Sequence, residues 1–91
     1  MAPITLTLYS RPGCHLCEAM KEITYPVARD LGCTVTEVDI SGDPGLEARY
    51  GSDIPVLLVN GRKAFKYRLT ERELRKRLTA ERRAQPRLSL S

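Results

Sequence analysis

The hydrophobic pattern of this chain changes its period twice within the first forty residues. Residues 4–9 (ITLTLY) alternate with a period of two, which is typical of a strand, whereas the apolar residues of 16–31 recur at helical spacing. Residues 33–40 (CTVTEVDI) alternate again. The pattern therefore predicts a strand, a helix and a second strand. Two strands joined in this way through a helix are parallel, with a right-handed crossover.

The middle of the chain carries the signals of a short helix and a hairpin. Asp43 is suited to cap a helix that begins at the proline after it and ends at Gly51. Residues 54–59 and 62–67 have the pattern of strands, and the Asn-Gly pair between them is the strongest short hairpin signal. We expect these two strands to be antiparallel neighbours.

A last helix follows the hairpin. Thr70 and Glu73 form a capping box, which predicts a helix that frays near residues 83–85 because a proline follows. Pro26 interrupts the first helix, but the apolar spacing continues beyond it, so we expect a kink rather than an end.

These elements combine into an α/β domain with the order β-α-β-α-β-β-α. A four-stranded mixed sheet with helices on both faces is the arrangement that this order favours. The 91 residues suffice for one small core. We expect one domain over residues 1–84 and a flexible basic C-terminal tail over residues 85–91.

Positive charge is concentrated toward the C-terminal end. The formal net charge of +4 divides into +5 for residues 68–91 and −1 for the rest. Such a segment can attract nucleic acid or an acidic partner, but it is more often a solvated helix face. Aromatic residues make up only 5% of the chain, too few for a base-stacking platform, so we do not expect nucleic-acid binding. The cations that would carry such binding are Arg72, Arg75, Lys76, Arg82 and Arg83.

The N-terminal residues and the cysteine count indicate a reducing compartment. Residues 1–10 have no basic segment followed by an apolar run, and the longest aliphatic run, 56–59, is too short to cross a bilayer. We therefore expect a cytoplasmic protein with no membrane contact. Three cysteines, an odd number, argue against a framework of structural disulfides in such a compartment.

Cys14 and Cys17 stand three positions apart, directly after the first strand. Such a pair is either a redox centre or part of a metal site. A metal site would need His15 and Cys33 as further ligands, but Cys33 lies at the far end of a helix that is about 20–25 Å long. One chain cannot close that site, so we expect no metal, and a cluster shared between two subunits is the alternative.

The motif YSRPGCHLC at residues 9–17, together with IPV at 54–56 and the terminal hairpin, resembles the thioredoxin fold. Within that fold the chain is similar to the small glutaredoxin-like proteins, over about residues 4–80. The resemblance implies a thiol–disulfide oxidoreductase that cycles between dithiol and disulfide. Cys14 is then the exposed nucleophile and Cys17 the buried resolving thiol.

Several neighbours of the pair have candidate roles. The helix start favours the Cys14 thiolate, and Arg11 adds a positive charge nearby. His15 either lowers the Cys14 pKa or is an exposed first-turn residue. Tyr9 either lines the rim of the site or packs. Cys33 is expected to be a small apolar packing residue rather than a reactive thiol.

The resemblance also assigns a substrate-binding segment. Pro55 fits the cis-proline of the family, which lies beside the first cysteine, and Ile54 would pair its backbone with the substrate. Taken alone, Pro55 could be an ordinary proline at the start of a strand.

The chain departs from both parent families. Leu8 stands where thioredoxins carry a buried aspartate, and the chain has no Trp. Arg11 matches the basic residue with which glutaredoxins bind glutathione. Asp53, however, replaces a neutral hydroxyl, and residues 68–70 are bulky where glutaredoxins have Gly-Gly.

These features lead to predictions about cofactor, substrate and oligomeric state. We expect no bound cofactor, with glutathione at most a weak co-substrate. The expected substrate is a disulfide-containing protein or small molecule, the reductant is not identified, and the protein is expected to be a monomer. The alternative is a thioredoxin-fold binding module that docks a partner through the basic C-terminal helix, with little turnover.

Overall fold

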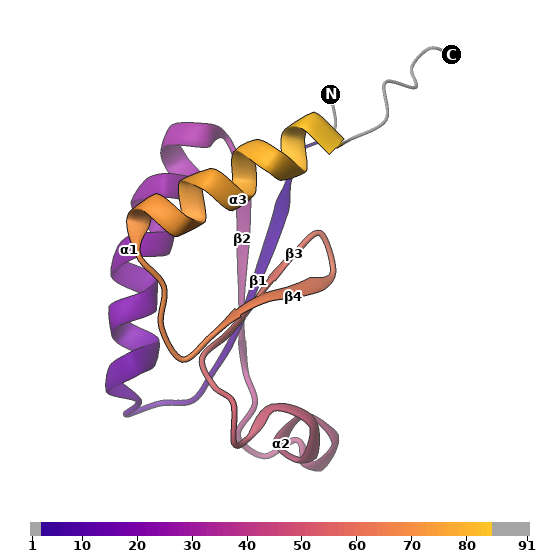
Figure 1. Ribbon diagram of the computed structural model, residues 1–91. Helices are drawn as coiled ribbons and strands as arrows, with labels where there is room; N and C mark the ends of the chain where they lie inside the picture. Colours follow the sequence, from indigo (N-terminus) through magenta and orange to yellow (C-terminus); the bar gives the residue numbers. More distant parts are fainter. Residues whose placement is uncertain (1–2, 85–91) are drawn as a thin grey trace.

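The computed structural model describes residues 3–84, so the expected tail at 85–91 lies outside the described residues. The elements follow the expected order (Figure 1). They are β1 (Thr5–Ser10), α1 (His15–Leu31), β2 (Thr34–Asp39), α2 (Pro44–Tyr50), β3 (Val56–Val59), β4 (Arg62–Lys66) and α3 (Glu71–Ala84).

The four strands form one mixed sheet in the order β2-β1-β3-β4. β1 and β2 are parallel, as expected for strands joined through a helix, while β3 pairs antiparallel with both β1 and β4. The register places Val56 opposite Tyr9. The start of β3 and the end of β1 therefore lie side by side at the same end of the sheet, where the chain continues from β1 into α1.

The alternation of side chains along the central strands produces two apolar clusters. Leu6, Leu8 and Leu57 face α1 and α3 and belong to the main core. Val56 and Leu58 face the other way, into a smaller cluster that includes Tyr50 of α2. The expected helices on both faces of the sheet are thus confirmed, with α1 and α3 on one face and α2 on the other (Figure 1).

Local signals fix the helix ends as expected. Gly32 ends α1 with a φ of 71°, a left-handed conformation that glycine adopts without steric cost. α1 runs through Pro26 and does not end there. The backbone N–H of Thr70 donates to Glu73 and that of Glu73 to the Thr70 hydroxyl, which confirms the capping box.

The hairpin differs from expectation in two details. β3 begins at Val56 instead of residue 54, because Pro55 has no N–H for the ladder. The register also shifts between Leu57 and Leu58, which leaves Ala64 of β4 as an extra residue. This β-bulge places Lys63 and Lys66 on the same face of the sheet, the face of Leu58 and Val56.

No helix among residues 3–84 combines the length and apolar character that a bilayer span requires.

Candidate functional site

Cys14 is the N-cap of α1. Its backbone is extended (φ −93°, ψ 110°), and the left-handed Gly13 before it (φ 78°) turns the chain from β1 toward the helix. The Cys14 Sγ accepts a hydrogen bond from the backbone N–H of Cys17, with the two atoms 3.1 Å apart. A helix start has free N–H groups and partial positive charge, so this position favours a sulfur anion.

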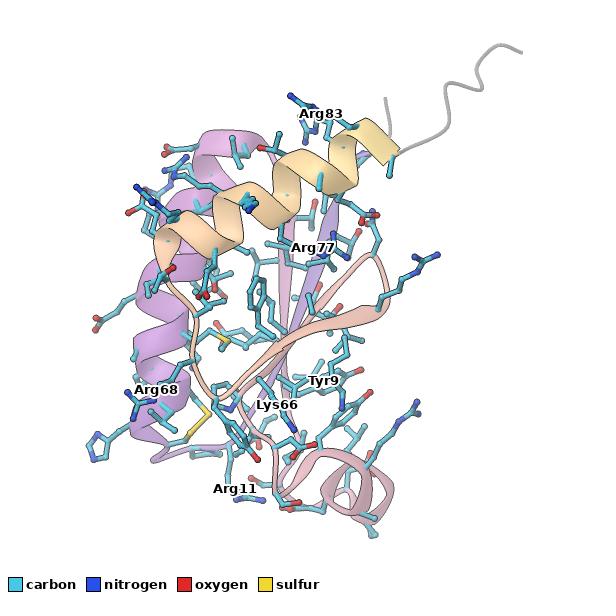
Figure 2. The ribbon with its side chains drawn as sticks, in the orientation of Figure 1. Tyr9, Arg11, Lys66, Arg68, Arg77 and Arg83 are labelled. Carbon is cyan, nitrogen blue, oxygen red and sulfur yellow. A yellow bond between two sulfur atoms is a disulfide. The ribbon has the colours of Figure 1, made fainter. Side chains whose placement is uncertain are left out.

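Cys14 and Cys17 differ in access to solvent. A disulfide joins them, with Cα atoms 5.2 Å apart, at the start of α1 (Figure 2). Cys17 is fully buried, whereas Cys14 is partly exposed. This asymmetry matches the expected order of an accessible first sulfur and a shielded second sulfur.

Arg11 and His15 lie close to the pair in sequence but have different surroundings. The Arg11 guanidinium binds the carboxylate of Glu47 in α2, at 2.5 Å. Glu47 therefore balances part of the Arg11 charge, which weakens the effect that Arg11 can have on the Cys14 thiolate. His15 is exposed at the first position of α1. The proposed effect of both residues on the Cys14 pKa stays a prediction.

The Ile54–Pro55 segment leads into β3 at the same end of the sheet at which the chain continues from β1 to Cys14. The register of Tyr9 with Val56 places it there, and the cis peptide bond agrees with the family's cis-proline. Pro55 is buried, and Ile54 is partly buried against the smaller apolar cluster. The assigned contact of Ile54 with substrate stays a prediction. Tyr9 packs, because its ring stacks on that of Tyr50 with centroids 4.3 Å apart.

Tyr67 is a site residue that the sequence does not reveal. It has a φ of 69°, which is unusual for a residue with a side chain. Its hydroxyl lies 3.2 Å from the Ser52 carbonyl and 3.3 Å from the Asp53 carboxylate, and its N–H donates to the Pro55 carbonyl at 2.9 Å. Tyr67 therefore contacts the chain on both sides of Ile54.

Asp53 has cationic neighbours. Its carboxylate oxygens lie 3.8 Å from the Lys63 ammonium and 3.9 Å from that of Lys66. The two lysines offset the negative charge that the sequence places beside the site. Glutathione itself carries carboxylates that Asp53 would repel, and the two lysines weaken this repulsion.

A groove of about 460 Å³ runs between α1 and the segment that joins β4 to α3. We call it the disulfide groove, because Leu16, between the two cysteines, forms part of its wall. Tyr67 and Arg68 form the opposite side. The groove is mostly apolar, and its wall begins at Leu16, which lies two positions after Cys14 and one position before Cys17 in the chain.

Cys33 packs partly buried against the main core, at the other end of α1. Burial raises the pKa of its thiol, and the nearby Arg82 guanidinium opposes this shift. The partial burial of Cys33 and the resulting rise of its pKa favour the packing interpretation over a reactive thiol. In the part of the chain that the structure describes, no three His, Cys, Asp or Glu side chains form a cluster suited to a metal ion.

The cations of α3 are partly engaged within the chain. Arg75 binds the carboxylates of Asp30 and Glu71, and Arg82 donates to the Leu31 carbonyl. These contacts attach α3 to the end of α1. Two of the five cations considered for partner binding are thus used in packing.

Comparison with known proteins places this geometry in a family. The glutaredoxin-like domain (DUF836) matches residues 5–79. The chain belongs to the glutaredoxin-like family. A glutaredoxin-like protein of Dictyostelium discoideum is 34% identical over 77 residues, which cover 78% of this chain and 71% of that protein.

Solved structures share the fold of this chain. A crystal structure of a protein from X. campestris has a TM-score of 0.71 at 37% identity, covering 82% of this chain and 96% of that one. A thioredoxin from Halobacterium salinarum has a TM-score of 0.69 at 17% identity, covering 91% of this chain and 78% of that one. The second likeness shows the thioredoxin fold of this glutaredoxin-like domain.

The position of Cys14 predicts that it is the more acidic thiol of the pair. Its sulfur accepts an N–H bond at a helix start, whereas Cys17 is fully buried. We expect a Cys14 pKa below the free value of about 8.5 and a Cys17 pKa above it. Ultraviolet titration of the thiolate in Cys17→Ser and Cys14→Ser, each combined with Cys33→Ser, measures both values. A Cys14 pKa equal to or higher than that of Cys17 would reverse the assigned roles.

Proposed function

We propose that this protein is a dithiol–disulfide oxidoreductase in which Cys14 is the nucleophile and Cys17 the resolving thiol. The observation that carries the proposal is the Cys14 sulfur at the N-cap of α1, partly exposed and hydrogen-bonded to the Cys17 N–H. A thiolate, and not a thiol, attacks a disulfide, so a nucleophilic cysteine needs such stabilisation. Membership of the glutaredoxin-like family supports the same chemistry.

The reaction proceeds in two exchanges. The Cys14 thiolate attacks one sulfur of the substrate disulfide, forms a mixed disulfide and releases the first substrate thiolate. Cys17 then loses its proton to that thiolate or to water and attacks the Cys14 sulfur, which releases the second substrate thiol. The substrate gains two electrons, and the protein ends with the Cys14–Cys17 disulfide present in this structure.

The second exchange takes place without the buried carboxylate of thioredoxins. Leu8 occupies that position and is fully buried in the main core. The proton of Cys17 therefore leaves through solvent or through the departing thiolate. The rate of the second exchange therefore depends on how accessible the mixed disulfide at Cys14, and with it the buried Cys17 thiol, is to water.

The proposal extends to the setting of the reaction. We propose a cytoplasmic monomer that needs no bound cofactor and reduces protein or small-molecule disulfides. The alternative function, partner binding through α3, is not favoured by the contacts of that helix, because Arg75 and Arg82 bind within the chain.

Reversible oxidation in redox buffers tests the function directly. The protein is equilibrated with mixtures of reduced and oxidised dithiothreitol, its free thiols are alkylated, and each cysteine is scored by mass spectrometry. We expect Cys14 and Cys17 to lose their label together in one two-electron transition while Cys33 keeps its label. Loss of label at only one of the pair, or none under any mixture, would contradict a cycling dithiol.

Glutathione is expected to be a poor reductant and substrate here. The free N–H groups at the start of α3, which could hold a carboxylate, are partly occupied by the Thr70–Glu73 capping box. Asp53 carries a negative charge next to Ile54, and Lys63 and Lys66, at 3.8 and 3.9 Å, weaken its repulsion of glutathione without removing the carboxylate. We therefore expect a low rate in a glutathione-coupled assay, and a gain of about two- to fivefold in Asp53→Thr. High wild-type activity that the substitution leaves unchanged would show an ordinary glutaredoxin.

A further inference from the structure

Three cations lie on or just after β4, whose last residue pairs with Val56 at the end of the sheet that is followed by the disulfide. Lys63 and Lys66 belong to β4, an edge strand, and Arg68 follows it. Figure 2 shows Lys66 and Arg68 close to the disulfide end, together with Arg11, whereas Arg77 and Arg83 lie along α3 away from it. We call Lys63, Lys66 and Arg68 the cationic edge.

The β-bulge accounts for this grouping. Residues three apart on a regular strand point to opposite faces of the sheet. Because Ala64 is an extra residue, Lys63 pairs with Leu58 and Lys66 with Val56, whose side chains share one face. Both lysines therefore lie on the same side of the hairpin and approach Asp53. The sequence gives no sign of this arrangement.

The cationic edge keeps an excess of positive charge. The side chains of Lys63 and Lys66 are each 50% exposed, and both approach the same carboxylate, that of Asp53. Arg68 is exposed and makes no ion pair among residues 3–84. Lys63 and Lys66 thus share the single carboxylate of Asp53. Arg68 lines the disulfide groove together with Glu73, whose carboxylate accepts from the Thr70 N–H.

An apolar groove borders Arg68, the last of the three cations. Leu16 and Tyr67, on the two sides of the disulfide groove, are 36% and 41% exposed. They are two of the three large hydrophobic residues that are exposed in the described chain. Arg68 borders the same groove as Leu16, so a cation and exposed apolar surface lie together in a groove whose wall includes the residue between the two cysteines.

We propose that the cationic edge and the disulfide groove dock substrate polypeptides that carry acidic and apolar residues next to the disulfide-bonded cysteine. The proposal rests on the redox function above and specifies its substrate class. An extended polypeptide places acidic and apolar side chains together along one segment, which matches both parts of the surface. Charges at the rim of a binding site act mainly by accelerating encounter, so the preference is expected in the rate of the first exchange.

Single-turnover reduction tests the proposal. Protein that has been reduced and freed of reductant is mixed with either of two fluorescent peptide disulfides, identical except that Glu residues beside the cysteine in one are Gln in the other. We expect the acidic peptide to react about tenfold faster at low salt. The ratio should approach one at about 1 M salt, where the Debye length is about 3 Å.

Two variants with the same loss of charge locate the effect. The first combines Lys63→Gln, Lys66→Gln and Arg68→Gln. The second combines Arg72→Gln, Lys76→Gln and Arg83→Gln, all on α3. Circular dichroism and a denaturation midpoint establish that both are folded. The ratio of acidic to neutral rates should fall to about one in the first variant and persist in the second.

The other outcomes decide against the proposal in distinguishable ways. Equal rates for the two peptides in the wild type, or equal loss of preference in both variants, would overturn the docking surface while leaving the redox function intact. Failure to reduce either peptide would contradict the redox function and the docking proposal with it. If the first variant lost rate only toward a glutathione mixed disulfide, the cationic edge would instead be a glutathione subsite.

Discussion

Cys14→Ser is expected to lower the rate of disulfide reduction at least about a thousandfold, to the level of the reductant alone. A serine hydroxyl is not ionised near neutral pH and cannot form the mixed disulfide, so the first exchange does not occur. The measurement is steady-state reduction of a peptide disulfide, with dithiothreitol as the recycling thiol and its direct reaction subtracted.

Cys33→Ser is the matched control, because it makes the same chemical change at the far end of α1. We expect its rate to stay within about twofold of the wild-type rate, since Cys33 packs against the core and its pKa is raised by burial. If Cys14→Ser kept most of the activity, or if Cys33→Ser abolished it, the assignment of the nucleophile would be wrong.

Leu8→Asp is expected to destabilise the domain by at least about 4 kcal/mol near neutral pH, out of a total of about 5–15 kcal/mol. Leu8 is fully buried among apolar side chains of the main core, where a carboxylate loses its hydration. Chemical denaturation followed by circular dichroism measures the loss. The substitution restores the residue type that thioredoxins carry at this position.

The destabilisation by Leu8→Asp should depend on pH in a defined direction. Burial raises the folded-state pKa of the introduced carboxyl above its unfolded value of about 3.9. The loss of stability is therefore smallest below that unfolded pKa, where the carboxyl is neutral in both states, and it grows as the pH rises toward the folded pKa. Leu8→Asn is the control, with a loss that is large but independent of pH. A loss below about 1 kcal/mol near neutral pH would mean that the position reaches water.

The fold follows from local signals that are strong in this sequence. Periodicity identifies β1, α1 and β2, and caps at Asp43 and Thr70 mark where α2 and α3 begin, with the Asp43 carboxylate accepting from two backbone N–H groups. The Asn60–Gly61 turn has positive φ at both residues, as the hairpin signal requires. Each of these features depends on residues adjacent in sequence, so the sequence alone predicts them.

The candidate site is only partly predictable, because most of its contacts join residues that are distant in sequence. The cysteine pair and the proline are recognised from short motifs. The partner of Arg11, the lysines around Asp53 and the contacts of Tyr67 all join residues far apart in sequence. The bulge at Ala64 decides the face on which Lys63 lies, and it has no local signature. The sequence therefore identifies the cysteine pair proposed to react, but not the charges around it.

Trapping of the mixed disulfide tests the central claim most directly, namely that Cys14 attacks and Cys17 resolves. Reduced Cys17→Ser and reduced Cys14→Ser, each also carrying Cys33→Ser, are mixed with the acidic peptide disulfide and examined by intact-mass spectrometry. We expect Cys17→Ser to accumulate a peptide adduct on Cys14, which dithiothreitol removes, and Cys14→Ser to accumulate little. An adduct that forms equally fast on Cys17 of the Cys14→Ser variant, or no adduct on Cys14, would show that Cys14 is not the attacking thiol.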